Sequence, residues 1–319
     1  MIRRIPPNTF AIPFGIAGLA GCWLTRALGG TTHQIGTGLL ALAALVWLIL
    51  VFDYALYAAA HPGALTGDLR DRAAGPFLSL ALIVPMILAA QGLAPRAPTA
   101  GKVTVDIFIV LAVVAGGWYT GEWIYGDPDV DRFHPGYFLP TVAGGLIGSA
   151  AAANVGQTRL AHILLGLGVF CWLILGSVIL ARLLLRPMLP EALIPTLAIE
   201  VAPAPIATLA LFAMHGYVIN DVTEAIGGYG LLMVLAQLRL LPVYRRLPFM
   251  TSTWAFTFSW AAVARVGIIW LQVLRPAGCR VEMDLILIAI TALVACIFIK
   301  TVVSLARGTY LPPSATSLH

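Results

Sequence analysis

The chain has 319 residues, of which 60% are hydrophobic and 10% are charged, and its formal net charge is +5. Soluble domains carry about 25% charged residues, so this composition excludes a soluble domain and indicates a polytopic membrane protein. We therefore expect a lipid bilayer around it and no nucleic-acid partner. The four cysteines have unrelated spacings and the six histidines form no close pair, so neither disulfides, a metal site nor a cofactor is expected.

Ten apolar segments follow one another along the chain, each near the roughly 20 residues that span the hydrocarbon of a bilayer. Links such as Gly29 to His33 and Asn154 to Arg159 are short enough to force antiparallel pairs. We predict one all-α transmembrane domain over residues 1–319, built of five helical hairpins. The ten helices are expected at about 9–28, 34–60, 76–94, 103–125, 136–154, 160–184, 195–214, 218–241, 250–274 and 283–307.

Proline occurs inside the first, third, fifth and seventh segments and inside none of the even-numbered ones. These candidate helix-bending and pore-lining residues are Pro13, Pro85, Pro140 and Pro203. A proline removes one backbone hydrogen bond, and in lipid the freed carbonyl must be satisfied by neighbouring helices or by a water-filled cavity. The ninth segment carries Phe258 instead of a proline. One such feature per hairpin predicts a quasi-five-fold ring with the odd helices inside, around a central pore.

Arginine and lysine fix the expected orientation, because positively charged loops remain in the cytoplasm. With the N-terminus inside, most of the 19 basic residues fall on the cytoplasmic side. We therefore predict that both termini are cytoplasmic.

Several catalytic and energy-coupling motifs are missing. The sequence contains no Gly-rich loop ending in Gly-Lys-Ser/Thr, no His-Glu-x-x-His and no Gly-x-Ser-x-Gly. We expect neither an ATP-driven pump nor an enzyme.

Six short motifs, in this order and spacing, resemble the tellurite-resistance/dicarboxylate transporter family. That family includes bacterial tellurite-resistance channel homologues and the slow-type anion channels of plant guard cells. The motifs are Phe10-Ala-Ile-Pro13-Phe-Gly15, Ala81-Leu-Ile-Val-Pro85, His134-Pro-Gly-Tyr-Phe-Leu-Pro140, Ala202-Pro203-Ala204, Gly228-Tyr-Gly230 with Leu238-Arg-Leu240, and Trp254-Ala-Phe256-Thr-Phe258. The resemblance runs over nearly the whole chain.

The resemblance implies ten helices as five hairpins around one pore per subunit, in a homotrimer of the bacterial inner membrane. It also implies that Phe258 plugs the resting pore. Phe256 and Phe258 lie about 200° apart on a helix, so only one of them can face the axis. Without the resemblance, the sequence favours an aromatic residue packed between helices at Phe258, and the family position reverses this in favour of a pore-facing gate. A ring across a narrow apolar constriction would stop ions by steric block and by dewetting.

Arg265 follows Phe258 by seven residues, which returns it to nearly the same helix face, about 10.5 Å farther along. It either attracts anions into the pore, pairs with an acid such as Asp106, Glu282 or Asp284, or extends its charged end to the outer membrane interface. Glu200 either pairs with an arginine such as Arg182, Arg186 or Arg239, or is a protonatable group that couples transport to protons.

Two functional classes remain open. The first is an anion channel that passes small inorganic or organic anions past the Phe258 gate. The second is a proton-coupled secondary transporter for C4-dicarboxylate, sulfite or tellurite.

Overall fold

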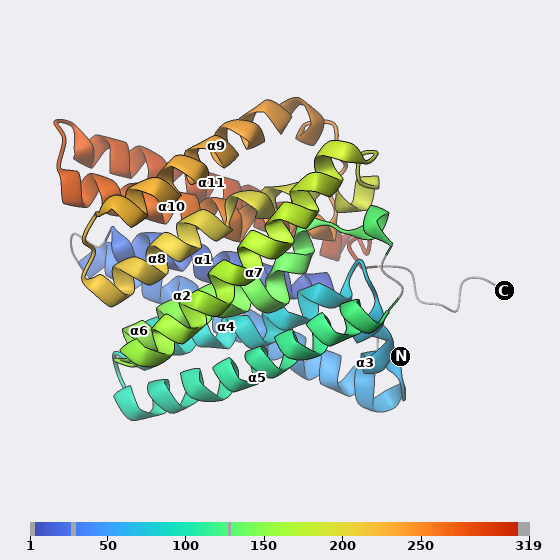
Figure 1. The fold of residues 1–319 in the computed structure, drawn as a ribbon. Coiled ribbons are helices and arrows are strands. Elements are labelled where there is room, and N and C mark those ends of the chain that lie inside the picture. Colours follow the sequence, from blue (N-terminus) through green and yellow to red (C-terminus); the bar gives the residue numbers. More distant parts are fainter. Residues whose placement is uncertain (1–3, 27–29, 127–128, 312–319) are drawn as a thin grey trace.

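The computed structural model describes residues 4–26, 30–126 and 129–311, and every regular element within them is a helix (Figure 1). The predicted segment end at 27–28 and the link residue Gly29 lie outside these ranges. Five long outer helices are α2 (Gly30–Ala60), α5 (Pro98–Tyr125), α7 (Thr158–Leu185), α9 (Asp221–Tyr244) and α11 (Cys279–Ala306). Two short helices, α3 (Ala64–Arg70) and η4 (Val130–Arg132), lie in connections.

Five composite segments alternate with these outer helices. They are η1 (Pro7–Phe10) with α1 (Ala11–Thr25); η2 (Gly75–Ser79) with α4 (Leu80–Leu88) and η3 (Ala89–Leu93); η5 (Pro135–Tyr137) with η6 (Leu139–Ala143) and α6 (Gly144–Asn154); η7 (Glu191–Val201) with α8 (Pro203–His215); and η8 (Thr251–Trp254) with α10 (Ala255–Leu274). We call these the composite segments.

Nine helices of the described chain are long and apolar enough to cross a membrane. The first composite segment is not among them, and its α-helical part, α1, has 15 residues. The predicted eighth segment, 218–241, contains no proline, but the helix observed there ends farther along the chain. Helix α9 continues to Tyr244 and includes Pro242.

Burial separates the two sets of helices. Within the apolar 18-residue stretch of each composite segment, the buried share is 67% for Gly75–Leu93, 89% for Pro135–Asn154 and 78% for Glu191–His215. The corresponding values for the five outer helices lie between 11% and 28%, and the segment containing α10 is intermediate at 39%. The composite segments therefore form the interior, and the outer helices expose large apolar side chains, as a protein in lipid does.

All five composite segments begin with a 3₁₀ turn, namely η1, η2, η5, η7 and η8. Two of the segments also contain a π-helical turn, η3 and η6. Pro85 lies inside α4 and has no N–H to donate to the carbonyl of Ala81. That carbonyl instead accepts a hydrogen bond from Trp47 Nε1 of α2, at 2.9 Å. A neighbouring helix thus satisfies the group that the proline frees.

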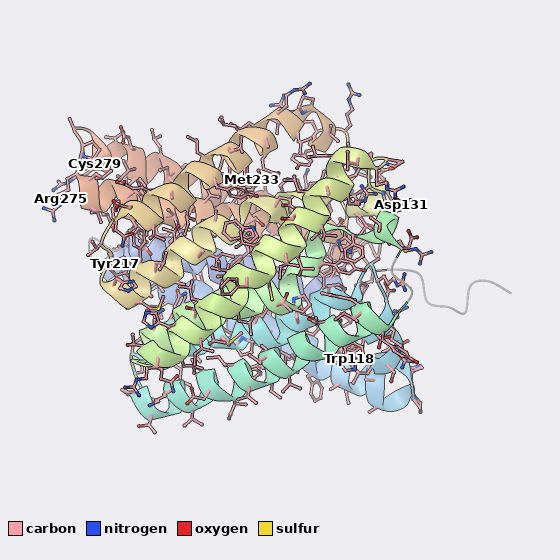
Figure 2. The ribbon with its side chains drawn as sticks, viewed as in Figure 1. Trp118, Asp131, Tyr217, Met233, Arg275 and Cys279 are labelled. Atoms are coloured by element: carbon pink, nitrogen blue, oxygen red, sulfur yellow. The ribbon has the colours of Figure 1, made fainter. Side chains whose placement is uncertain are left out.

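Both described ends of the chain lie at the same end of the bundle. Asn8 donates to the Thr251 hydroxyl at 2.7 Å, and the rings of Phe249 and Tyr310 have centroids 6.2 Å apart. We call this the Arg4 end. Tyr217, Arg275 and Cys279 lie at the opposite end, which we call the Tyr217 end (Figure 2).

Candidate functional site

Two cavities lie among the composite segments. The Tyr217 cavity has about 60 Å³ of space open to the centre of a water molecule, and each composite segment contributes to its wall. One residue from each segment is Ala17, Ile87, Ile147, Leu209 and Ala262. The Trp254 cavity, about 30 Å³ by the same measure, is lined from the same five segments, for example by Phe14, Leu80, Val142, Ile199 and Ala255. Both walls are mainly apolar.

Phe258 and Ile206 line both cavities, so these two side chains stand where the cavities approach one another. The Phe258 ring stacks on Phe14, with centroids 3.6 Å apart and planes 13° apart. Gly18 leaves room for it, because a Cβ on Gly18 would come within 2.9 Å of Phe258 Cδ2. Phe256 points elsewhere and meets Tyr244 of α9 edge to face, at 4.8 Å. Of the two aromatic residues, Phe258 is thus the one on the cavities.

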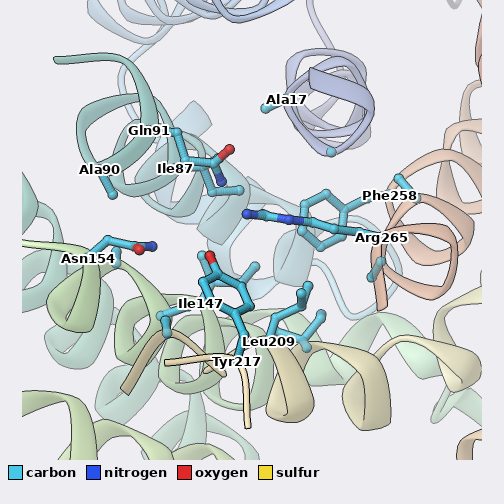
Figure 3. Close-up of a pocket in the computed structure, with 17 residues that line it drawn as sticks. Ala17, Ile87, Ala90, Gln91, Ile147, Asn154, Leu209, Tyr217, Phe258 and Arg265 are labelled. Atoms are coloured by element: carbon cyan, nitrogen blue, oxygen red, sulfur yellow. The ribbon is translucent and has the colours of Figure 1, made fainter. Parts of the chain in front are cut away.

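Arg265 lines the Tyr217 cavity together with Phe258, as its position seven residues farther along α10 predicted (Figure 3). Its Nε donates to the Thr25 hydroxyl at 2.9 Å, and its guanidinium passes over Gly21, where a Cβ would lie 3.0 Å from Nη1. Arg265 forms no ion pair within the described residues.

The acids that could have paired with Arg265 are engaged elsewhere or exposed. Asp284 pairs with Arg26 at 2.9 Å, Asp106 accepts from Gln157 at 3.0 Å, and Glu282 is exposed. Arg26 is buried at the end of α1, and its guanidinium donates to the Asp284 carboxylate of α11. Asp284 is therefore already paired.

Glu200 lies in η7, buried at 6% exposure, and lines neither cavity. Its Oε1 has no hydrogen-bond partner within the described chain. Of the two alternatives for Glu200, the pairing with an arginine is not formed within the described residues. Arg182 donates to the Asp131 carbonyl at 3.0 Å, Arg186 pairs with the Asp131 carboxylate at 3.6 Å, and Arg239 is exposed on α9.

The four prolines occupy different environments. Pro203 begins α8 and lines the Trp254 cavity. Pro13 lies near the start of α1 and Pro140 within the π-helical η6, and neither lines a cavity. Pro85 lines an open hollow between α4 and α2 instead.

Three polar side chains on the Tyr217 cavity were not singled out from the sequence: Gln91, Asn154 and Tyr217. The only available signal was for Gln91, a lone amide inside an apolar segment, because polar groups within the membrane are costly and often functional. Asn154 and Tyr217 stand at segment ends, where polar residues are ordinary.

Nine helical segments of the described chain are long and apolar enough to cross a membrane, and the buried composite segments enclose two cavities. These features are typical of an integral membrane protein of the channel and transporter class. The chain belongs to the family described as voltage-dependent anion channels, which matches residues 4–302. This confirms the resemblance drawn from the sequence motifs. Members of this family are membrane channels and transporters rather than enzymes.

The chain is similar to the tellurite resistance protein TehA homolog of Haemophilus influenzae. It is 24% identical to this chain over 262 residues, which are 82% of this chain and 79% of that protein.

Proposed function

We propose that the protein is an anion channel whose passage runs through the subunit and is closed by Phe258. The ten helices form five hairpins in a quasi-five-fold ring, with the composite segments inside. The observation that carries this proposal is that the two cavities draw their walls from the same five segments and share Phe258 and Ile206. The line through both cavities is the proposed pore.

The closed state has a simple physical basis. The Phe258 ring is held against Phe14, and the surrounding wall is apolar except for Ser259, whose hydroxyl donates to the Ala255 carbonyl at 3.0 Å. A narrow apolar constriction excludes water as well as ions, so conduction requires the ring to move or to be removed.

Charge supports anions over cations. Among the described residues, no acidic side chain lines either cavity, and Arg265 places a guanidinium on the wall of the Tyr217 cavity. A positive group in a low-dielectric cavity raises the local concentration of anions. The partners are accordingly small inorganic or organic anions.

The proposed membrane orientation places the Arg4 end in the cytoplasm of a bacterium, with the protein in the inner membrane and both termini cytoplasmic. Arg70, Arg132 and Arg186 form surface ion pairs at this end, in agreement with the rule that positive charge stays inside. A homotrimer with one pore in each subunit follows from the family resemblance.

Glu200 supports the alternative, a proton-coupled secondary transporter for C4-dicarboxylate, sulfite or tellurite. A buried carboxylate whose Oε1 lacks a partner is the kind of group that can carry a proton. Its absence from both cavity walls separates it from the proposed path of the anion. We therefore place the channel first.

The deciding experiment is the current through reconstituted Phe258→Ala. We expect ohmic chloride and nitrate currents that are absent from the unaltered protein, and no current from the matched control Phe256→Ala, whose ring faces Tyr244. If Phe258→Ala passes no current while the unaltered protein takes up malate or sulfite only with a proton gradient, the channel proposal is wrong and the transporter stands.

A further inference from the structure

Four polar side chains from four segments converge on the Tyr217 cavity. Arg265 comes from α10, Gln91 from η3, Asn154 from the end of α6, and Tyr217 from the turn after α8. Figure 3 shows the guanidinium, the amide groups and the phenol hydroxyl directed toward one space, with alanine, isoleucine and leucine side chains between them. An apolar cavity with a few convergent polar groups is the usual form of a small-molecule site.

Contacts with α1 orient the Arg265 guanidinium, and its two Nη groups, which we call the Arg265 fork, remain available to bind a ligand. Its Nε is used by Thr25, and Gly21 lets the side chain lie flat against α1. The two Nη groups form no hydrogen bond with the described residues, and neither is buried beyond reach. A guanidinium held in this way presents two parallel N–H donors to the cavity.

Two further groups are held in unusual backbone conformations. Gln91 lies in the π-helical turn η3, and single π turns frequently occur at functional sites. Its amide nitrogen faces the cavity, while its Oε1 is buried without a partner in the described chain (Figure 3). Tyr217 has φ of 64°, a left-handed conformation that is costly for a side chain of this size.

The charge of this site is not balanced by the protein. The cavity wall contains one arginine and no carboxylate. Arg265 is half-buried, and a charge on an apolar wall is costly unless it is paired or hydrated. The missing negative charge is therefore the natural ligand.

We propose that the Tyr217 cavity is a binding site for a small planar oxyanion, such as nitrate or a carboxylate, held by the Arg265 fork and by the Gln91 amide. Tyr217 and Asn154, both exposed in part, form the mouth that admits it from the Tyr217 end. This inference rests on the proposed function, since it names the class of anion that the channel collects before its gate.

Shape and size favour this class over halides and large anions. Two oxygens in one plane match the paired N–H groups of a guanidinium, whereas a spherical halide cannot accept both in ideal geometry. A single water needs about 10–15 Å³ of this kind of space, so the 60 Å³ of the cavity has room for about four to six water-sized groups, which is enough for nitrate or formate but not for a much larger anion.

The test uses the purified full-length protein in detergent, with Phe258 intact. Thermal unfolding is followed while sodium nitrate or sodium formate replaces sodium chloride at constant ionic strength. A ligand that binds only the folded state raises the unfolding midpoint by an amount that grows with the logarithm of one plus the ratio of ligand concentration to Kd. We expect nitrate and formate to raise it more than chloride does.

Three variants identify the site. Arg265→Gln should weaken nitrate binding about tenfold or more, because it removes a charge-assisted pair of hydrogen bonds. Arg265→Lys keeps the charge and loses the fork, so its nitrate preference over chloride should disappear. Arg280→Gln is the matched control. It removes one exposed cation near Cys279 at the same end of the molecule, and should bind nitrate as the unaltered protein does.

If the Arg265 variants do not fold, Gln91→Leu provides the test, with a smaller but measurable loss of nitrate binding. Equal stabilisation by nitrate and chloride in the unaltered protein overturns the proposal, as does undiminished nitrate binding in Arg265→Gln or in Gln91→Leu. These outcomes are separate from the channel proposal. If Phe258→Ala passes current but the protein does not bind nitrate, the binding-site proposal is wrong and the channel proposal stands. If the protein binds nitrate but Phe258→Ala passes no current, the channel proposal is wrong and the binding site stands.

Discussion

The stack of Phe258 on Phe14 should set how firmly the proposed gate is closed. The perturbation is Phe14→Leu, which keeps an apolar side chain at this position and removes the ring that lies 3.6 Å from that of Phe258. An aromatic pair contributes about 0.5–1.5 kcal/mol beyond the burial of its area. If the stack exists only in the closed state, its loss raises the ratio of open to closed channels about two- to twelvefold.

The assay is single-channel recording in a planar bilayer, which separates open probability from conductance. Leucine is smaller than phenylalanine and widens the Trp254 cavity, so conductance can rise as well; open probability is the quantity that the stack controls. Phe256→Leu is the matched control, because it removes an edge-to-face pair with Tyr244 away from both cavities. An open probability in Phe14→Leu no higher than in Phe256→Leu would refute the reasoning.

Two predictions concern the Arg4 end. His134 is completely buried, and burial lowers its pKa to about 4, so the unfolded chain binds a proton below about pH 6.5 that the folded protein does not. The free energy of unfolding should therefore fall as pH is lowered from about 6.5 to about 4, by about 3 kcal/mol, and His134→Asn should flatten this slope in denaturant titrations; an unchanged slope would contradict the assignment. Asp68 is buried and accepts hydrogen bonds from Arg4 and, at 3.0 Å, from Tyr54. Asp68→Asn should lower the free energy of unfolding by about 1.5–3 kcal/mol, and an unaltered unfolding midpoint would show that this anchor contributes nothing.

Helical periodicity explains why some of the candidate site could be predicted. The 100° step of an α-helix places Phe256 and Phe258 on different faces and returns Arg265 to the face of Phe258, and α10 is regular over this stretch. Both relations involve residues on one helix, so they do not depend on how the other helices pack. The sequence also indicated that Pro85 frees a backbone carbonyl that must find a donor in lipid, but only the packing of α2 against α4 identifies that donor as Trp47, bonded to the Ala81 carbonyl.

Gln91 escaped prediction because its direction depends on a π-helical turn. One extra residue in the turn shifts the face that every later side chain presents, and nothing in the composition of Ala89–Leu93 indicates such a turn. Glu200 shows the same limit for the 3₁₀ segment η7, where the residues before Pro203 do not follow α-helical spacing.

The sequence by itself determined that this is a helical membrane protein, the family to which it belongs, and that Phe258 and Arg265 share a face. These properties follow from local apolarity, motif order and the geometry of a single helix. Only the tertiary structure decided which side chains form hydrogen bonds and ion pairs with one another. Arg265 bonds to Thr25, 240 positions away, while Asp284 is taken by Arg26. Competition among charges is settled by which side chains packing brings together, and that is a property of the assembled bundle.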